Sequence, residues 1–482
     1  MIDMNKKIEN LLLCLVMGTV LASCDFDTQN YQQKPAEEAY QTVKDVRNGM
    51  NSAYQVLGSS SFLGCTVQLY NDVCSDVTLG SYNTGHFNAQ SSWVISENDY
   101  EMEYIWENGY KIIDRCTRTI QSAKGMLAKA EELHLDSDET AELLSYMAQC
   151  HAVKALAYHY LVNFFCYPYH KGTENLGLPL VKDKPIEPFE SIRRATVGET
   201  YQLITDDLAE AERLTEECGI VPNAFCMSDM GIQALKARVY LAMGDYEVAR
   251  KAALKAIELK GNGDGTGDDY TPTDDNYISM WTSLAITDED LFTIAKSESD
   301  NLGASSLNTY YDTYCLTFQY ATLDLFGEND IRQNLIMENQ MGLITAKFQG
   351  LPTSAMVSNI PIFRKSEMSL IVAEAEARAG NIEAAQNYLF YTAKRDKDLT
   401  SADQLPETTE ELLAFIADER VREFAGEGHR FMEARRMGLQ LYLQDFADPF
   451  DIANFVFPIP ASEINAGFCT EQNENWEAGL PE

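Results

Sequence analysis

Residues 229–259 read DMGIQALKARVYLAMGDYEVARKAALKAIEL, a pattern in which small residues recur where two helices would approach each other. Ala237, Ala249 and Ala256 occupy these positions, and Gly244 falls at the turn between the two halves. Small residues are needed there because the two backbones come close, and this spacing is typical of a tetratricopeptide hairpin. The stretch therefore predicts two antiparallel helices joined by a tight turn.

A second copy of this pattern lies at 367–395, with Ala373, Gly380 and Ala385 in the corresponding places. One hairpin cannot bury its apolar face alone, so stacked neighbours are implied. Apolar residues also recur at helical spacing in three earlier segments, at about 36–57, 100–130 and 138–165. We predict a mainly α fold, in which a tetratricopeptide-like scaffold of helical hairpins carries a large irregular, loop-rich insertion and a few short strands.

Two segments, at about 58–99 and 260–360, lack helical periodicity and are rich in Gly, Ser, Asn, Asp and Tyr. The second contains short apolar runs at Leu291–Ala295 and Leu343–Phe348, which are more typical of strands. Loops carried by a rigid scaffold are where ligands are usually contacted. We expect both segments to face a ligand.

The N-terminus has the three parts of a lipoprotein signal peptide. Lys6 and Lys7 precede the apolar run Leu11–Leu21, and small residues lead to Cys24. The apolar run is too short to span a bilayer. We expect residues 1–23 to be a signal peptide, Cys24 to carry lipid, 24–35 to be a tether and 36–482 to form a single body outside the cytoplasm.

The charge of the chain limits its partners. Its 37 basic and 74 acidic residues leave a formal net charge of −37. Nucleic acids and anionic bilayer surfaces are polyanions that would repel it. Of 11 cysteines, one lies in the expected signal and one is the expected lipid site, which leaves an odd number without a C-x-x-C pair. Disulfides between Cys65 and Cys74, or between Cys218 and Cys226, stay open.

Taken in order, several motifs resemble those of the SusD/RagB family of surface nutrient-binding lipoproteins. The early motifs are AVKALAYHYLVNFF (152–165), GLPLV (177–181), RATV (194–197) and the 229–259 hairpin. The later ones are PIFR (361–364), AEAEARAG (373–380), DERVREFAGEGHRF (418–431), RRMG (435–438) and FPIP (457–460). Met437 stands where the family usually has tryptophan, and the 473–476 tail also departs from the family pattern.

The resemblance implies a mostly helical body with four tetratricopeptide-like units and an irregular ligand-facing portion. It implies a lid on a TonB-dependent (SusC-like) transporter in the outer membrane, which captures oligosaccharides and passes them inward without catalysis. Oligopeptide capture is the alternative within the same import system. A surface glycoside hydrolase, which would need two carboxylates at the bottom of a cleft, and a tetratricopeptide adaptor for protein partners are the other readings.

Oligosaccharide capture requires flat aromatic faces bordered by polar groups that bond hydroxyls. In the 58–99 segment we select the residues Trp93, Tyr82, Asn83 and His86. In the 260–360 segment we select Tyr310, Tyr311 and Tyr314, because tyrosine supplies a ring and a hydroxyl at low entropic cost. Either group could instead pack its own segment against the scaffold. Trp106 and Trp281 are expected in the core, with Trp281 leading a strand-like run.

A glycine-rich acidic turn at 262–269 offers the oxygen ligands that calcium prefers, from Asp264, Asp268 and Asp269. No bidentate glutamate follows, so a solvated acidic loop is the competing reading. No other cofactor is expected. The charged run from Glu419 to Arg436 has opposite charges at helical spacing, which favours an ion-paired helix over an acid–base centre. The sequence has no G-x-S-x-G, H-E-x-x-H or P-loop motif.

Overall fold

The computed structural model describes residues 39–187, 189–261, 273–443 and 446–481. Contacts divide the chain into two units, Met1–Asp45 and Val46–Glu482. In the first unit, Thr42 Oγ1 donates a hydrogen bond to Asp45 Oδ2 at 2.8 Å, close to the start of the first described helix. The following description concerns the second unit.

Helices dominate the described residues, which confirms the mainly α prediction. They are α2 (Val43–Leu57), α3 (Thr66–Val73), α4 (Asn88–Ser91), α5 (Tyr100–Leu127), α6 (Ser137–Phe165), α7 (Val197–Cys218), α8 (Asp229–Met243), α9 (Tyr246–Lys260), α10 (Asp274–Ser279), α11 (Tyr320–Leu323), α12 (Lys365–Arg378), α13 (Ile382–Ala393), α14 (Thr409–Phe424), α15 (Arg430–Met437) and α16 (Ala461–Ala466).

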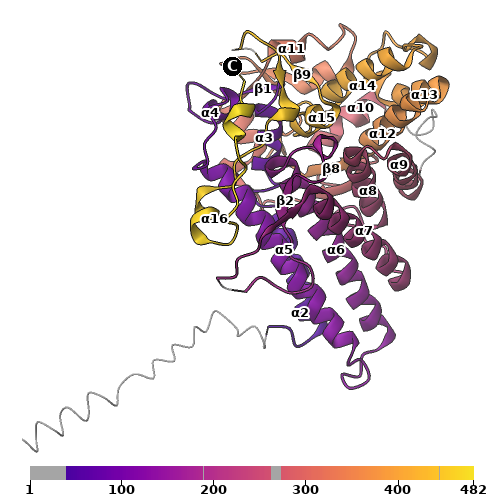
Figure 1. The fold of residues 1–482 in the computed structure, drawn as a ribbon. Helices are drawn as coiled ribbons and strands as arrows, with labels where there is room; N and C mark the ends of the chain where they lie inside the picture. The colour runs from indigo at the N-terminus through magenta and orange to yellow at the C-terminus, as the bar shows by residue number, and fades with distance from the viewer. Residues whose placement is uncertain (1–38, 188, 262–272, 444–445, 482) are drawn as a thin grey trace, which may run out of the picture. The chain divides into compact units, whose positions relative to one another are not determined.

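The two predicted hairpins are present as α8/α9 and α12/α13, and α9 packs against α12. Each turn requires a left-handed backbone, which glycine adopts without steric cost: Gly244 has φ +78° and Gly380 has φ +79°. Ala237 and Ala249 are fully buried, where α8 and α9 lie against each other. In Figure 1, α8 lies next to α7, and the α12/α13 hairpin lies beside the α8/α9 hairpin.

Two long helices, α5 and α6, run side by side and pack together, with α7 on the other side of α6. The start of α6 is a capping box: Asp136 accepts from the backbone N–H groups of Asp138 and Glu139, and Glu139 accepts from that of Asp136. The second half of α6 is buried almost all round, from Cys150 to Leu161. This helix is therefore the centre of the N-terminal core.

The strands of the described residues form five two-stranded antiparallel sheets. They pair β1 (Thr78–Leu79) with β5 (Thr317–Phe318), β2 (Leu176–Pro179) with β3 (Arg194–Thr196), β4 (Asp290–Ile294) with β8 (Ile360–Arg364), β6 (Ile336–Glu338) with β7 (Leu343–Thr345), and β9 (Gln440–Leu441) with β10 (Phe450–Asp451). In the first sheet, Thr78 lies opposite Phe318. This pairing joins the two segments that the sequence marks as irregular.

Two details differ from the sequence-based expectation. The 58–99 segment contains α3, whose residues from Val67 to Val73 are all buried, and some of its polar side chains have partners inside the protein. One such partner is Gly428, whose backbone N–H donates to Asp72 Oδ2 at 3.1 Å. Trp281 lies in a short 3₁₀ turn (Met280–Thr282), not at the head of a strand, although it is buried as expected.

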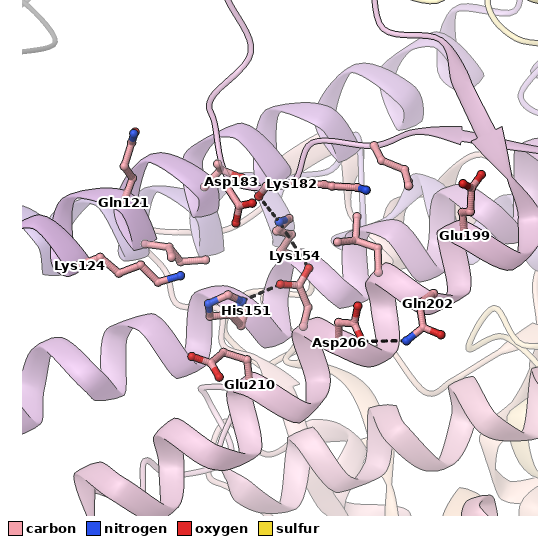
Figure 2. Close-up of a pocket in the computed structure, with 15 residues that line it drawn as sticks. Gln121, Lys124, His151, Lys154, Lys182, Asp183, Glu199, Gln202, Asp206 and Glu210 are labelled. Carbon is pink, nitrogen blue, oxygen red and sulfur yellow. Dashed lines mark hydrogen bonds and ion pairs between the residues drawn. The ribbon is translucent and has the colours of Figure 1, made fainter.

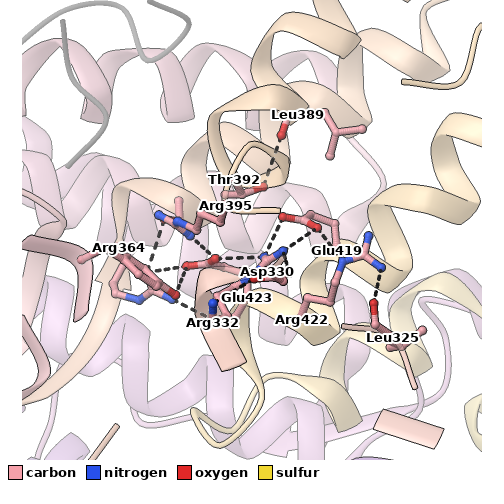
Figure 3. Close-up of polar contacts among 12 residues, drawn as sticks. Leu325, Asp330, Arg332, Arg364, Leu389, Thr392, Arg395, Glu419, Arg422 and Glu423 are labelled. Atoms are coloured by element: carbon pink, nitrogen blue, oxygen red, sulfur yellow. Dashed lines mark hydrogen bonds and ion pairs between the residues drawn. The ribbon is translucent and has the colours of Figure 1, made fainter. Parts of the chain in front are cut away.

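The charged run on α14 and α15 is paired as predicted, but most of its partners lie far away in sequence (Figure 3). Glu423 is fully buried and accepts from Arg364 Nη1 at 2.8 Å and from Arg332 Nη1 at 3.4 Å, and Arg395 also pairs with it. Burial would raise the pKa of Glu423, but Arg395, Arg364 and Arg332 outweigh it and hold this pKa below its usual range. The cluster is therefore ionised and structural.

All nine cysteines of the described residues are free thiols, so neither of the considered disulfides forms. Within the same residues, no helix has both the length and the hydropathy that crossing a bilayer demands. The expected signal peptide, the tether and Cys24 lie outside the described residues.

Candidate ligand-binding site

Six aromatic side chains from three segments form a surface that we call the aromatic patch. Its members are Tyr82, His86, Tyr100, Tyr104, Tyr310 and Tyr314. The β1–β5 pairing places the residues after Leu79 beside those before Thr317, which brings His86 to the tyrosines. Burial raises the pKa of Tyr310, and nearby Cys65, Glu101 and Tyr100 contribute, which places the start of α5 beside the same tyrosine.

The centre of the patch is a stacked pair of rings. The His86 and Tyr314 centroids lie 3.8 Å apart and their planes are inclined by 23°. Tyr310 meets both rings edge-on, at 5.5 Å from His86 and 5.2 Å from Tyr314. Thr84 Oγ1 donates to the Tyr314 carbonyl at 2.9 Å, which fixes one loop on the other. Aromatic pairs at these separations hold each other in position.

Polar and exposed groups border the stack. Tyr82 is 86% exposed, the most accessible ring of the patch. Its neighbour Asn83 is also exposed, and its Nδ2 lies 3.1 Å from the sulfur of Met341. At the start of α5, burial raises the pKa of Glu101 to about 7, while a hydrogen bond with Glu101 is the main cause that raises the pKa of Tyr100 to about 12. The rim is therefore acidic or neutral.

Asp99 anchors the loop that carries the patch. Its carboxylate accepts from Tyr70 Oη at 2.7 Å, from Gln90 Nε2 at 2.8 Å and from the backbone N–H of Met102 at 3.1 Å. One side chain thus connects α3, α4 and the N-terminus of α5. The position of the patch is set by the scaffold and not by the loop alone.

Trp93 does not present its ring to a ligand, contrary to the expectation from sequence. It is only 4% exposed and meets Phe450 and Phe455 edge-on, with centroids 4.6 and 5.1 Å away. Its backbone has φ +55°, a left-handed conformation that its packing against the C-terminal segment stabilises. Trp93 anchors its own loop in the core.

Tyr311 is also buried, with 1% of its surface exposed, and its hydroxyl lies 3.4 Å from Asp72 Oδ2. It lies in a π-helical turn, Thr309–Thr313, which directs Tyr311 inward while Tyr310 and Tyr314 stay partly exposed. Sequence reasoning missed Tyr100 and Tyr104, which are both exposed and meet edge-on at 6.1 Å. Their spacing of four residues places both rings on one face of an amphipathic helix, and this pattern could have identified them from the sequence.

The candidate calcium ligands Asp264, Asp268 and Asp269 lie outside the described residues. Across the ranges that the structure describes, no group of three or more His, Cys, Asp or Glu side chains is arranged to hold a metal ion. The chemistry of the aromatic patch is that of ring faces and hydrogen-bonding rims.

Two protein-family models match the chain. Residues 26–241 match a model described as "Starch-binding associating with outer membrane", and residues 291–475 match the model of the SusD family. Together these matches include the α12/α13 hairpin, nearly all of α8 and most of the body, while α9 lies between them. No curated protein matches the chain in sequence.

Solved structures share the fold. A SusD superfamily protein from Bacteroides thetaiotaomicron has 25% identity and a TM-score of 0.77, over 90% of this chain and 100% of that one. A SusD superfamily protein from Bacteroides vulgatus has 27% identity and a TM-score of 0.76, over 91% and 100%. A SusD-like carbohydrate binding protein from Bacteroides vulgatus has 17% identity and a TM-score of 0.73, over 92% and 99%, and shows likeness of fold alone.

Proposed function

This chain belongs to the SusD family, and from that premise we propose that it is a cell-surface lipoprotein that captures oligosaccharides for import across the outer membrane. The description of one matching model, starch-binding and association with the outer membrane, supports the ligand class and the location. Lipid on Cys24 would hold the protein at the membrane, and a TonB-dependent transporter would receive the ligand.

The observation that carries this proposal is the stacked pair of His86 and Tyr314, with Tyr82 exposed nearby. Aromatic faces contact the apolar face of a pyranose ring, and the buried edge-on contacts of Tyr310 keep the pair rigid before the ligand arrives. A site that is formed in advance loses little side-chain entropy on binding. Asn83 supplies a neighbouring amide for hydroxyl groups.

The role is binding without catalysis. The glutamates of the charged run are committed to arginines in the interior, and Glu423 has a lowered pKa, so the charged run is structural and not an acid–base centre. The aromatic patch itself holds a single histidine whose ring is stacked on tyrosine. A patch of this kind holds a ligand and releases it unchanged to its partner.

A glycan array with the full chain in detergent, beside a panel of oligopeptides, tests the proposal. We expect a limited set of oligosaccharides to bind and the double variant His86→Ala/Tyr314→Ala to lose them. Tyr442→Ala, which removes an exposed tyrosine outside the three patch segments, serves as the control and keeps binding. If no glycan on the array bound and oligopeptides did, oligosaccharide capture would be rejected in favour of peptide capture.

A further inference from the structure

A hollow of about 510 Å³ lies between α5, α6 and α7, in the part of α5 opposite to the aromatic patch (Figure 2). Its α5 residues run from Thr117 to Lys124, whereas the patch uses Tyr100 and Tyr104. At 1.5 Å per residue, Tyr104 and Thr117 are about 20 Å apart along the helix. The hollow is therefore separate from the patch, and its volume is in the range of small-molecule sites.

The floor of this hollow is a buried polar group of three side chains. His151 Nδ1 and Asp207 Oδ1 are 2.6 Å apart, and Lys154 Nζ lies 3.5 Å from Asp207 Oδ2. Lys154 also donates to the Lys182 carbonyl at 3.0 Å. Donation from His151 Nδ1 to the carboxylate leaves Nε2 as an acceptor, and within the described residues it has no hydrogen-bond partner. Buried polar atoms of this kind are usually paired, so the floor lacks a donor.

The rim is exposed and mostly acidic. Four carboxylates line it, from Asp183, Glu199, Asp206 and Glu210, against the two exposed lysines Lys124 and Lys182. Figure 2 shows these side chains on several sides of His151 and Lys154. Hydrogen bonds with Arg213 are the main cause that lowers the pKa of Glu210, and His151 and Lys124 contribute, so this group is ionised at neutral pH. Ile120, Leu180 and Leu203 supply apolar wall between the charges.

We propose that this hollow is a second binding site, which takes a small polar ligand carrying a primary ammonium group. The ammonium supplies the donors that the floor lacks and meets the excess of carboxylates at the rim. Lys124 and Lys182 face the oxygen atoms of the same ligand. An amino sugar and the N-terminus of a short peptide share this chemistry, and an anionic ligand is disfavoured by the rim.

Calorimetric titration of the full chain in detergent tests the site with two matched pairs of probes, each with and without the ammonium. The pairs are glucosamine with glucose, and glycylglycine with its N-acetyl derivative. We expect at least one ammonium probe to bind more than tenfold tighter than its neutral counterpart. Binding of glucosamine alone identifies an amino sugar, and binding of glycylglycine alone identifies a peptide end. Equal affinities within both pairs, or no heat from any probe, would overturn the proposal.

The double variant Asp206→Asn/Glu210→Gln locates the binding without disturbing the buried floor. We expect it to weaken binding of the ammonium probe at least tenfold, while Glu247→Gln on α9, which removes one carboxylate charge at an exposed position away from the hollow, has no effect. Histidine NMR provides the second readout, because the chain has six histidines and the His151 signal should shift on titration. Unchanged affinity in the double variant would place the ligand elsewhere and reject the site. Oligosaccharide binding at the aromatic patch should be equal in all these variants, which separates this test from that of the proposed function.

Discussion

The imidazole of His86 lies flat on the ring of Tyr314, and the two residues come from the two chain segments that meet at one end of the β1–β5 pairing. Neither ring could hold this position alone, since each belongs to a loop. Each ring therefore depends on the other, and on the edge of Tyr310 that contacts both.

Replacement of Tyr314 by alanine should weaken oligosaccharide binding and leave the fold intact. The substitution removes one ring face and leaves His86 without its stacking partner. We expect the binding free energy to weaken by about 1 to 2 kcal/mol, which corresponds to a five- to thirtyfold higher Kd. Titration with an oligosaccharide selected on the array measures this change. Tyr314→Phe keeps the stack and should bind nearly as well as the unaltered protein; an equal loss in both variants would point to the hydroxyl instead of the ring.

Replacement of Trp93 by alanine should destabilise the protein and not act on the ligand directly. The indole is buried between Phe450 and Phe455, and removing a large buried aromatic side chain costs about 3 to 5 kcal/mol. Chemical denaturation measures this cost. Trp93→Phe should recover a large part of the lost stability. If Trp93→Ala instead kept its stability and lost ligand binding, Trp93 would have to be a ligand-binding residue.

Acid should destabilise the fold through a buried histidine. Burial is the main cause that lowers the pKa of His159 to about 3, and Arg238 contributes. The unfolded chain, with an ordinary histidine pKa of about 6.5, binds the proton first. Stability is therefore complete above pH 6.5 and decreases as the pH falls from about 6.5 toward 3, by on the order of 4 kcal/mol at most.

The ring of His429 stacks on that of Phe424, with centroids 4.3 Å apart, and burial is the main cause that lowers its pKa as well. Denaturation at several pH values gives the free energy of unfolding as a function of pH. In His159→Phe this free energy should decrease less steeply between pH 6.5 and 4, with a remaining slope from His429. An identical slope in the variant and the unaltered chain would assign the acid sensitivity to other groups.

Removal of the charge of Glu423 should be among the most costly single changes in this protein. Glu423→Gln leaves Arg332, Arg364 and Arg395 without their shared carboxylate, and breaking a buried ion pair in this way costs about 3 to 5 kcal/mol. Thermal unfolding followed by circular dichroism measures the change. Glu247→Gln, which breaks an exposed pair with Lys251, should cost less than about 1 kcal/mol.

The helical scaffold could be predicted because it depends on local rules. The small residues of 229–259 and 367–395 and the glycines at their turns are readable within one segment, and both hairpins form where these indicate. The candidate ligand residues were chosen for their chemistry, and the structure brings His86, Tyr310 and Tyr314 together while it buries Trp93 and Tyr311.

What the sequence could not supply is contact between distant segments. The burial of Trp93 depends on Phe450 and Phe455, and the charges of α14 depend on Arg332, Arg364 and Arg395. Neither set of partners shares a local pattern with the residue that it contacts. The helical spacing of charges suggested pairs within one helix, and Arg422 with Glu419 is such a pair. Arg436 with Glu433 is another, whereas Glu423 finds its partners across the core.

The pairing of Thr78 with Phe318 has a consequence for how the protein matures. Because one half of the aromatic patch is synthesised long before the other, a growing chain cannot assemble it until the second irregular segment has also been synthesised. Contacts between such distant segments form late in folding. The surface proposed to bind the ligand therefore cannot form before the chain has been synthesised as far as Phe318 of its 482 residues.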